Sequence, residues 1–221
     1  ITGIPNRRQY EKDMVELKGK ADALRCVFSL DMANLKILNE EKLGGVGHEA
    51  ADKVLTFFAR KLQEEVNGAA PQTAPVVLHN SYHMHGDEFC AVVASAIPEA
   101  SAFQVAMEKL AQRIASIRFS SSDEKCAPFA VEGKKYPETY FRVGALCSPR
   151  ADYDSADKLQ EFVGVQMKAD YPDRSKVVPL AGRINYKFTT SGLSAEERAK
   201  LEDATAPVRP SAASAAERSV L

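Results

Sequence analysis

Short β-rich runs alternate along this chain with longer segments of helical periodicity, and this order limits the possible folds more than any other feature. We predict strands over residues 24–31, 76–84, 89–95, 140–147 and 184–189. We predict helices over residues 5–18, 34–43, 49–66, 99–117 and 155–169. The β-α-β-β-α-β core within this order predicts an α+β fold, in which a mostly antiparallel five-stranded sheet is flanked by helices.

The composition of the chain and its first residue indicate how the chain is organised. We expect one domain over residues 1–190 and an extension over residues 191–221, with a short helix followed by an Ala/Ser/Pro-rich tail. The chain begins at Ile1 rather than Met, so we expect a fragment or a processed product that lacks upstream domains. The cysteines form no CxxC pair, which disfavours zinc ribbons and favours buried thiols in a cytosolic protein.

Acidic and basic side chains nearly balance over the 221 residues, with 29 Lys and Arg against 30 Asp and Glu. No strong basic field is available to attract nucleic acid at long range. No apolar run reaches the roughly 18 residues that a membrane helix needs. We therefore expect neither a nucleic-acid partner nor a membrane segment in this chain.

Acidic side chains mark two places where predicted strands end. Asp31 closes the first strand, and Asp87 and Glu88 occupy the turn between the second and the third. If these strands are neighbours, the carboxylates converge at one end of the sheet. Mg²⁺ prefers carboxylate oxygens together with substrate phosphates, and two such ions can activate a hydroxyl and steady a leaving pyrophosphate. Solvated acidic residues at strand ends are the alternative that the spacing leaves open.

Three histidines, His79, His83 and His85, occupy the predicted strand before this turn. Their spacing places all three on one face of an extended strand. Ligands on one straight strand lie about 7–13 Å apart, which is too far for them to share a zinc ion. We therefore expect a polar strand face near the mouth of a pocket rather than a histidine metal site.

Five segments of the chain, in order, resemble the sequence blocks of one known family. The opening ITGIPNRR resembles LTGLPNRR, and residues 30–55 (LDMANLKILNEEKLGGVGHEAADKVL) resemble the DxDxFKxxND and GHxxGDxxL block. HGDEF at residues 85–89 resembles the GGDEF signature, YFRVGA at 140–145 the strand TxSxGxA, and QMK at 166–168 the YxAK motif. The chain thus resembles GGDEF domains, the family of diguanylate cyclases, over residues 1–185. The resemblance implies a bacterial, cytoplasmic domain that condenses two GTP molecules into cyclic di-GMP.

The resemblance also implies roles for the matching residues. Asp31, Asp87 and the backbone carbonyl of Met32 would hold two Mg²⁺ or Mn²⁺ ions. Asn39 and Asp52 would hydrogen-bond the guanine edge, because Asp accepts from guanine N–H groups and Asn donates to a ring acceptor. Each domain would hold one GTP, so catalysis needs a homodimer in which two GGDEF domains meet face to face.

The 3′-hydroxyl and the triphosphate of GTP would lie near the hairpin turn and near basic side chains. Glu88 would lie beside the attacking 3′-hydroxyl, with His85 and Gly86 next to the nucleotide. The implied catalytic residues are Asp87, Glu88 and Lys168. The residues implied to neutralise the triphosphate are Lys36, Lys168 and either Arg174 or Arg183.

Several positions depart from the family pattern. His85 replaces the first signature glycine, where its Cβ and ring would narrow the pocket or force a turn that costs about 1–2 kcal/mol. Arg142 replaces a small polar residue, and the spacing from Asn39 to Asp52 is four residues longer than in the family. The remaining departures are His83 for an arginine, Ala33 for the second Asp of DxD, and Asn34 for an apolar residue. Two hypotheses stay open: an active diguanylate cyclase, and a degenerate domain that binds GTP or another protein as a regulatory module.

Overall fold

The computed structural model describes residues 2–18, 20, 23–43, 45–69, 76–95, 100–134, 136–148, 180 and 186–190. Its helices are α1 (Arg7–Lys18), α2 (Leu35–Asn39), α3 (His48–Gly68) and α4 (Ala100–Ala115), with short 3-10 helices η1 (Glu41–Leu43) and η2 (Ala127–Phe129). Its strands are β1 (Leu24–Met32), β2 (Val76–His85), β3 (Glu88–Ser95), β4 (Arg118–Phe119), β5 (Thr139–Ser148) and β6 (Tyr186–Thr190). The helix predicted over residues 155–169 and the extension over residues 191–221 lie outside the described residues.

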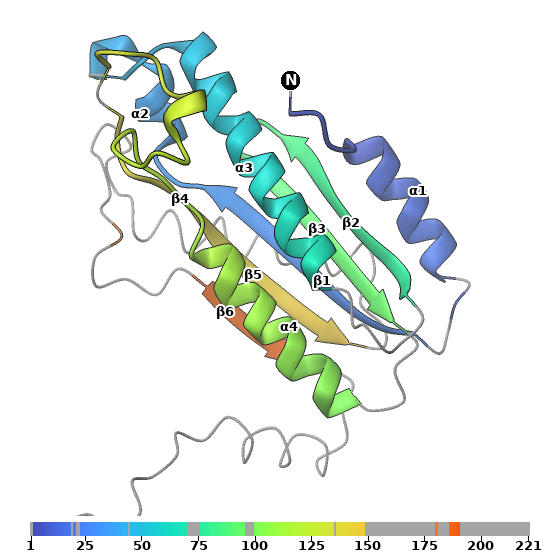
Figure 1. Ribbon diagram of the computed structural model, residues 1–221. Coiled ribbons are helices and arrows are strands. Elements are labelled where there is room, and N and C mark those ends of the chain that lie inside the picture. The colour runs from blue at the N-terminus through green and yellow to red at the C-terminus, as the bar shows by residue number, and fades with distance from the viewer. Residues whose placement is uncertain are drawn as a thin grey trace, which may run out of the picture.

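The strands form one sheet in the order β2-β3-β1-β5, and both β4 and β6 pair with β5 (Figure 1). Every pairing is antiparallel except that of β5 with β6. The α+β prediction and its β-α-β-β-α-β core are confirmed, and all five predicted strands are present. Strand β4 was not predicted, because a strand of 2 residues is too short to show an alternating pattern.

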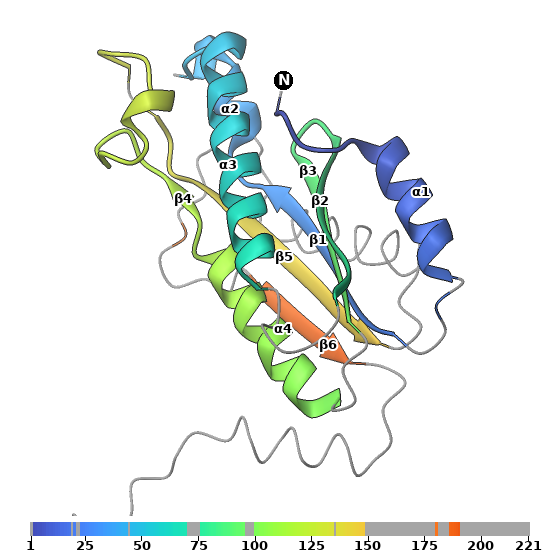
Figure 2. The same ribbon diagram turned by 45° about the vertical axis from the view of Figure 1, so that its right-hand side comes forward.

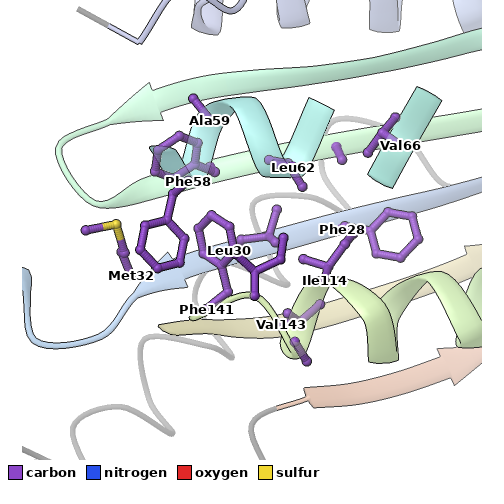
Figure 3. Packing of buried hydrophobic residues seen from close by; sticks show 14 of the residues in the cluster. Phe28, Leu30, Met32, Phe58, Ala59, Leu62, Val66, Ile114, Phe141 and Val143 are labelled. Carbon is purple, nitrogen blue, oxygen red and sulfur yellow. The ribbon is translucent and has the colours of Figure 1, made fainter. Parts of the chain in front are cut away.

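The main hydrophobic core lies between the sheet and helices α3 and α4, which cover one face (Figure 2). Phe28 and Leu30 of β1 point into this core, where Phe58 of α3 meets Phe141 of β5 (Figure 3). The rings of Phe58 and Phe141 pack edge to face, with centroids 4.7 Å apart. The strand period of two and the helical period of α3 therefore meet in one apolar layer. Truncating a buried ring such as that of Phe58 to Ala costs about 3–5 kcal/mol.

Helix α1 covers the opposite face of the sheet, beside β2 (Figure 2). The buried rings of Tyr10 and Tyr82 pack edge to face, with centroids 5.2 Å apart. The Tyr82 hydroxyl donates to Oδ2 of Asp13 at 2.6 Å, and Asn80 and Gln9 also donate to this carboxylate. Burial raises the pKa of Tyr82, and the hydrogen bond to Asp13 raises it further. Tyr82 and Asn80 lie on β2, so two of the three donors fasten α1 to the sheet, and Gln9 lies on α1 itself.

Two predicted helices differ in extent from those observed. The segment 34–43 divides into α2 and η1, because Glu40 leaves the helix with an extended backbone (φ −95°, ψ 102°). The segment 99–117 is helical only to Ala115 within its described part, and the Ile117 N–H then donates to the Ile114 carbonyl in a tight turn that leads into β4. Among the described residues, no helix combines the length and apolar character needed to cross a membrane.

Candidate functional site

The acidic residues of the first strand and of the hairpin turn lie at the same end of the sheet (Figure 1). Asp31 is directly opposite Glu88 in the antiparallel register of β1 and β3. The Met32 N–H donates to the Asp87 carbonyl oxygen at 3.0 Å. Asp31 is buried, whereas Asp87 and Glu88 are half-buried. The strands are therefore neighbours, which is the condition for these carboxylates to converge, and the chemical roles of the three acidic residues remain predictions.

In the hairpin turn, Gly86 is the residue with an unusual backbone conformation. Gly86 has a φ of 53°, in the left-handed region that favours glycine. His85 is the last residue of β2, pairs with Glu88, has an exposed side chain and does not have a positive φ. The alternative that His85 forces a strained turn is therefore wrong, because β2 continues through this residue and the left-handed position comes one residue later.

His83 stabilises the hairpin turn through its ring and its backbone N–H. Its Nε2 lies 2.9 Å from the Gly86 carbonyl oxygen, so a ring that carries its proton on Nε2 donates to that oxygen. The ring stacks on Phe89, with centroids 4.8 Å apart. The His83 backbone N–H donates to the Pro5 carbonyl oxygen at 2.8 Å. His83 therefore ties the turn that carries Asp87 to the segment before α1.

The histidines of β2 do not share one face, so that prediction is wrong. His79 and His83 face the same side of the sheet as Phe89, whereas His85 pairs with Glu88 on the other side. The register shifts between His83 and His85, and an extra residue in one strand reverses the alternation of the residues beyond it. Burial lowers the pKa of His79, which favours its neutral form.

A buried arginine lies beside Asp31 on the strand at its other side. Arg142 is directly opposite Asp31 in the antiparallel register of β1 and β5. Opposed residues of this kind point to the same face, with Cβ atoms about 4.5–5.5 Å apart. Asp31 and Arg142 are each only 7% exposed. Asp31 is therefore opposite the acid Glu88 on β3 and opposite Arg142 on β5.

The described residues around Asp31 fit a divalent cation poorly. Mg²⁺ is usually held by one or two carboxylates together with substrate phosphates, and the residue directly opposite Asp31 on β5 is Arg142, whose side chain carries a fixed positive charge. Ala33 has no ligand side chain, and its N–H donates to the Tyr140 carbonyl oxygen at 2.9 Å. No group of three or more His, Cys, Asp or Glu residues that could hold a metal ion occurs in the part of the chain that the structure describes. Two residues here, Arg142 and Ala33, therefore differ from the carboxylates that a divalent cation prefers.

The residues expected to bind guanine lie on helices that pack against each other. Asn39 ends α2, Asp52 lies near the start of α3, and both residues are half-buried. The linker between the helices folds back, so that the Val46 N–H donates to the Leu38 carbonyl oxygen at 2.9 Å. Backbone hydrogen bonds therefore help to fix the spacing of α2 and α3.

Gly45 allows this longer linker to close against α2. A Cβ at this position would lie 2.0 Å from the Ile37 carbonyl oxygen and 2.6 Å from that of Leu38. Any other residue would push the linker away, because real Cβ atoms essentially never approach another heavy atom within 3.0 Å. The Gly45 N–H also donates to the Glu40 carbonyl oxygen at 3.1 Å. The additional residues thus form a compact cap on α2.

Asn34 starts α2 in a way that the sequence analysis missed. Its backbone is left-handed (φ 66°, ψ 8°), a conformation that Asn tolerates better than most residues. Its side-chain Nδ2 donates to the Glu138 carbonyl oxygen at 2.7 Å, which ties the start of α2 to the segment before β5. A polar residue of a turn-forming type directly after β1 was the available signal.

A family comparison identifies the fold. The model of the family described as "Diguanylate cyclase, GGDEF domain" matches residues 1–167. The chain belongs to the GGDEF family. No curated protein sequence matches the chain.

Solved structures share this GGDEF fold at low sequence identity. Diguanylate cyclase SiaD from Pseudomonas aeruginosa, in complex with its activator SiaC, is 16% identical with a TM-score of 0.54, and the match covers 85% of this chain and 60% of the SiaD chain. The GGDEF domain of DgcB from Caulobacter crescentus, in complex with c-di-GMP, is 14% identical with a TM-score of 0.52, over 85% of this chain and 92% of its own. The active GGEEF domain of a diguanylate cyclase from Vibrio cholerae is 20% identical with a TM-score of 0.50, over 86% and 99%. At these identities the likeness establishes the fold.

Basic residues are expected near the triphosphate, and of these only Lys36 lies in the described part of this GGDEF domain. It lies on α2 with an exposed side chain, and its Nζ is 3.8 Å from Oε1 of Glu40. Lys168, Arg174 and Arg183 lie outside the described residues. An exposed ion pair of this kind contributes little energy, so Lys36 can turn toward a phosphate at small cost.

Proposed function

We propose that this GGDEF domain binds GTP through the guanine base and acts as a nucleotide-binding regulatory module with impaired cyclase activity. The packing of α2 on α3, with Asn39 and Asp52 half-buried on the two helices, carries the proposal. An Asp carboxylate accepts from the N1–H and N2–H groups of guanine, and an Asn amide can donate to O6. Adenine presents an acceptor at N1, so the same pair disfavours ATP.

The convergence of acidic residues favours a second candidate, the condensation of two GTP molecules into cyclic di-GMP by a pair of domains. In that reaction the 3′-hydroxyl oxygen of each GTP attacks the α-phosphorus of the other, and pyrophosphate leaves. Asp31, Asp87 and Glu88 lie at one end of the sheet as this candidate requires. We place it second because Arg142 lies directly opposite Asp31.

Displacement of a fluorescent GTP analogue from the purified chain tests GTP binding. We expect GTP to compete at least about tenfold more strongly than ATP, because the loss of one or two paired hydrogen bonds in a buried site is worth about 1.4 kcal/mol or more. Asp52→Ala and Asn39→Ala should each weaken GTP by a similar factor. Lys53→Ala is the matched control, because its exposed side chain lies next to Asp52 on the same helix. Equal competition by ATP and GTP, or full GTP affinity in both variants, would count against the proposal.

A forced dimer tests the second candidate, because two domains must face each other for condensation. The chain fused to a dimeric coiled coil is incubated with GTP and Mg²⁺, and cyclic di-GMP is measured by chromatography. We expect GTP to remain unconverted. Accumulation of cyclic di-GMP would establish the cyclase and reject the regulatory module with impaired activity.

A further inference from the structure

We infer that Arg142 supplies, as part of the protein, the positive charge that a divalent cation would otherwise bring to Asp31, so that GTP binding to this domain does not depend on Mg²⁺. The part of this inference that concerns GTP rests on the proposed function. The part that concerns the metal stands on the register of three strands and is tested without nucleotide.

The pairing of β1 with both of its neighbours defines the surroundings of Asp31. Glu88 lies opposite it on β3, and Arg142 lies opposite it on β5, so all three side chains share one face of the sheet. The next pair along the same face is Ser29 opposite Gly144, and neither residue carries a charge. Arg142 is therefore the nearest cationic residue in the register around Asp31 among the described strands.

Burial strengthens the effect of this arginine. Asp31 and Arg142 are each 7% exposed, and buried charges of opposite sign are stable mainly when they are paired and hydrogen-bonded. A guanidinium keeps its charge at every physiological pH and presents its donors in a rigid plane that matches a carboxylate. The residue opposite Asp31 therefore carries a permanent positive charge.

The same charge opposes a metal ion at this position. Directly opposed residues have Cβ atoms about 4.5–5.5 Å apart, and a dication on Asp31 that is about 6 Å from the guanidinium would be repelled by it. Even at the dielectric constant of bulk water, about 80, the repulsion at that distance weakens the binding of a dication about tenfold. The factor is larger in a buried site, where the effective dielectric constant is lower.

Electron paramagnetic resonance of Mn²⁺ tests the metal part directly, because free Mn²⁺ loses signal when it binds. The whole chain is titrated with Mn²⁺ alone, as wild type and as Arg142→Ser, which restores a small polar residue. We expect Arg142→Ser to bind Mn²⁺ at least about tenfold more tightly than wild type. Arg118→Ser is the control, because Arg118 is an exposed arginine on the adjacent strand β4 and its loss should leave Mn²⁺ binding unchanged. Arg142→Gln, which keeps amide donors and most of the side-chain length, replaces the serine variant if that variant does not fold.

Titration of GTP in EDTA and then in Mg²⁺ completes the test. We expect the wild-type affinity to agree within about twofold between the two conditions, and the affinity of Arg142→Ser to rise about tenfold with Mg²⁺. Equal Mn²⁺ affinity of wild type and Arg142→Ser, whether strong or undetectable, would overturn the inference, because Arg142 would then not be what excludes the ion. A wild type whose GTP affinity requires Mg²⁺ would also overturn it while leaving the proposed function intact. A chain that binds no GTP under either condition would refute the proposed function, and the Mn²⁺ titration would still decide the role of Arg142.

Discussion

Replacing Gly45 with alanine is expected to release the linker from α2 and to destabilise the domain. The added Cβ would lie 2.0 Å from the Ile37 carbonyl oxygen, so the backbone must move by about 1 Å to reach even the 3.0 Å limit of real contacts. Gly45 is not among the described residues with a positive φ, so the cost is steric rather than conformational. The movement breaks the hydrogen bonds donated by the Gly45 and Val46 N–H groups, which are worth about 1 kcal/mol each. It also exposes the buried Val46 side chain, which adds about 1.5 kcal/mol, so the loss in the free energy of unfolding is about 3–4 kcal/mol.

Urea unfolding followed by circular dichroism measures this loss. Gly68→Ala is the matched control, because a Cβ at Gly68, at the end of α3, has no heavy atom within 4 Å. The control should be neutral or more stable by up to about 1 kcal/mol, since alanine favours the helix. Gly45→Ala should also bind GTP more weakly, because Asn39 and Asp52 lose their fixed spacing. A Gly45→Ala chain as stable as Gly68→Ala would refute the steric reasoning.

Three further substitutions and one chemical test probe other parts of the fold. Tyr82→Phe removes a hydrogen bond to the Asp13 carboxylate and should lower the free energy of unfolding in urea by about 1.5 kcal/mol. This value is at the low end of the range for a hydrogen bond to a charged acceptor, because Asn80 and Gln9 still donate to the same carboxylate. Since the pKa of Tyr82 is raised in the folded chain, its contribution to stability is complete below about pH 10 and is lost as the pH rises further, so wild type should lose stability more steeply than Tyr82→Phe above that pH. Asp13→Ala should cost more than Tyr82→Phe, because it leaves the buried hydroxyl without its acceptor, and equal losses would contradict this. Asn34→Ala should cost about 2 kcal/mol through its left-handed backbone and the lost bond to the Glu138 carbonyl, and a neutral effect would exclude that explanation. Burial raises the pKa of Cys26, and the neighbouring Cys147 raises it further, so a thiol reagent at about pH 8 should modify Cys26 only after unfolding.

The order of elements could be predicted from the sequence because each element carries its own pattern of apolar residues. Strand β1 is buried on both faces from Arg25 to Met32, so a continuous β-rich run marks it, whereas on α3 the apolar residues recur at helical spacing. The helical period follows directly from burial on one side of the helix. The short strand β4 could not be predicted, because two residues show no periodic pattern and the position of the strand depends on its pairing with β5.

The candidate site was only partly predictable. The sequence brought Asp31 and the hairpin turn together only on the condition that their strands are neighbours, and β1 and β3 do pair in the structure. The opposite orientation of His85 did not follow, because it depends on a register shift within β2 that local composition does not reveal. Arg142 stood out as a departure from the family pattern, but its place opposite Asp31 depends on the pairing of strands more than 100 residues apart in the sequence. The close approach of Gly45 to α2 likewise depends on three-dimensional contacts.

Nuclear magnetic resonance of the labelled chain during a GTP titration tests most directly whether guanine binds between α2 and α3. The largest amide shift changes are expected along residues 35–52, at Asn39 and Asp52 above all, with smaller changes at the turn of residues 85–88. They should appear in EDTA and disappear in Asp52→Ala. Shift changes confined to α1 and β2, or an unchanged spectrum at saturating GTP, would contradict a guanine site on these two helices.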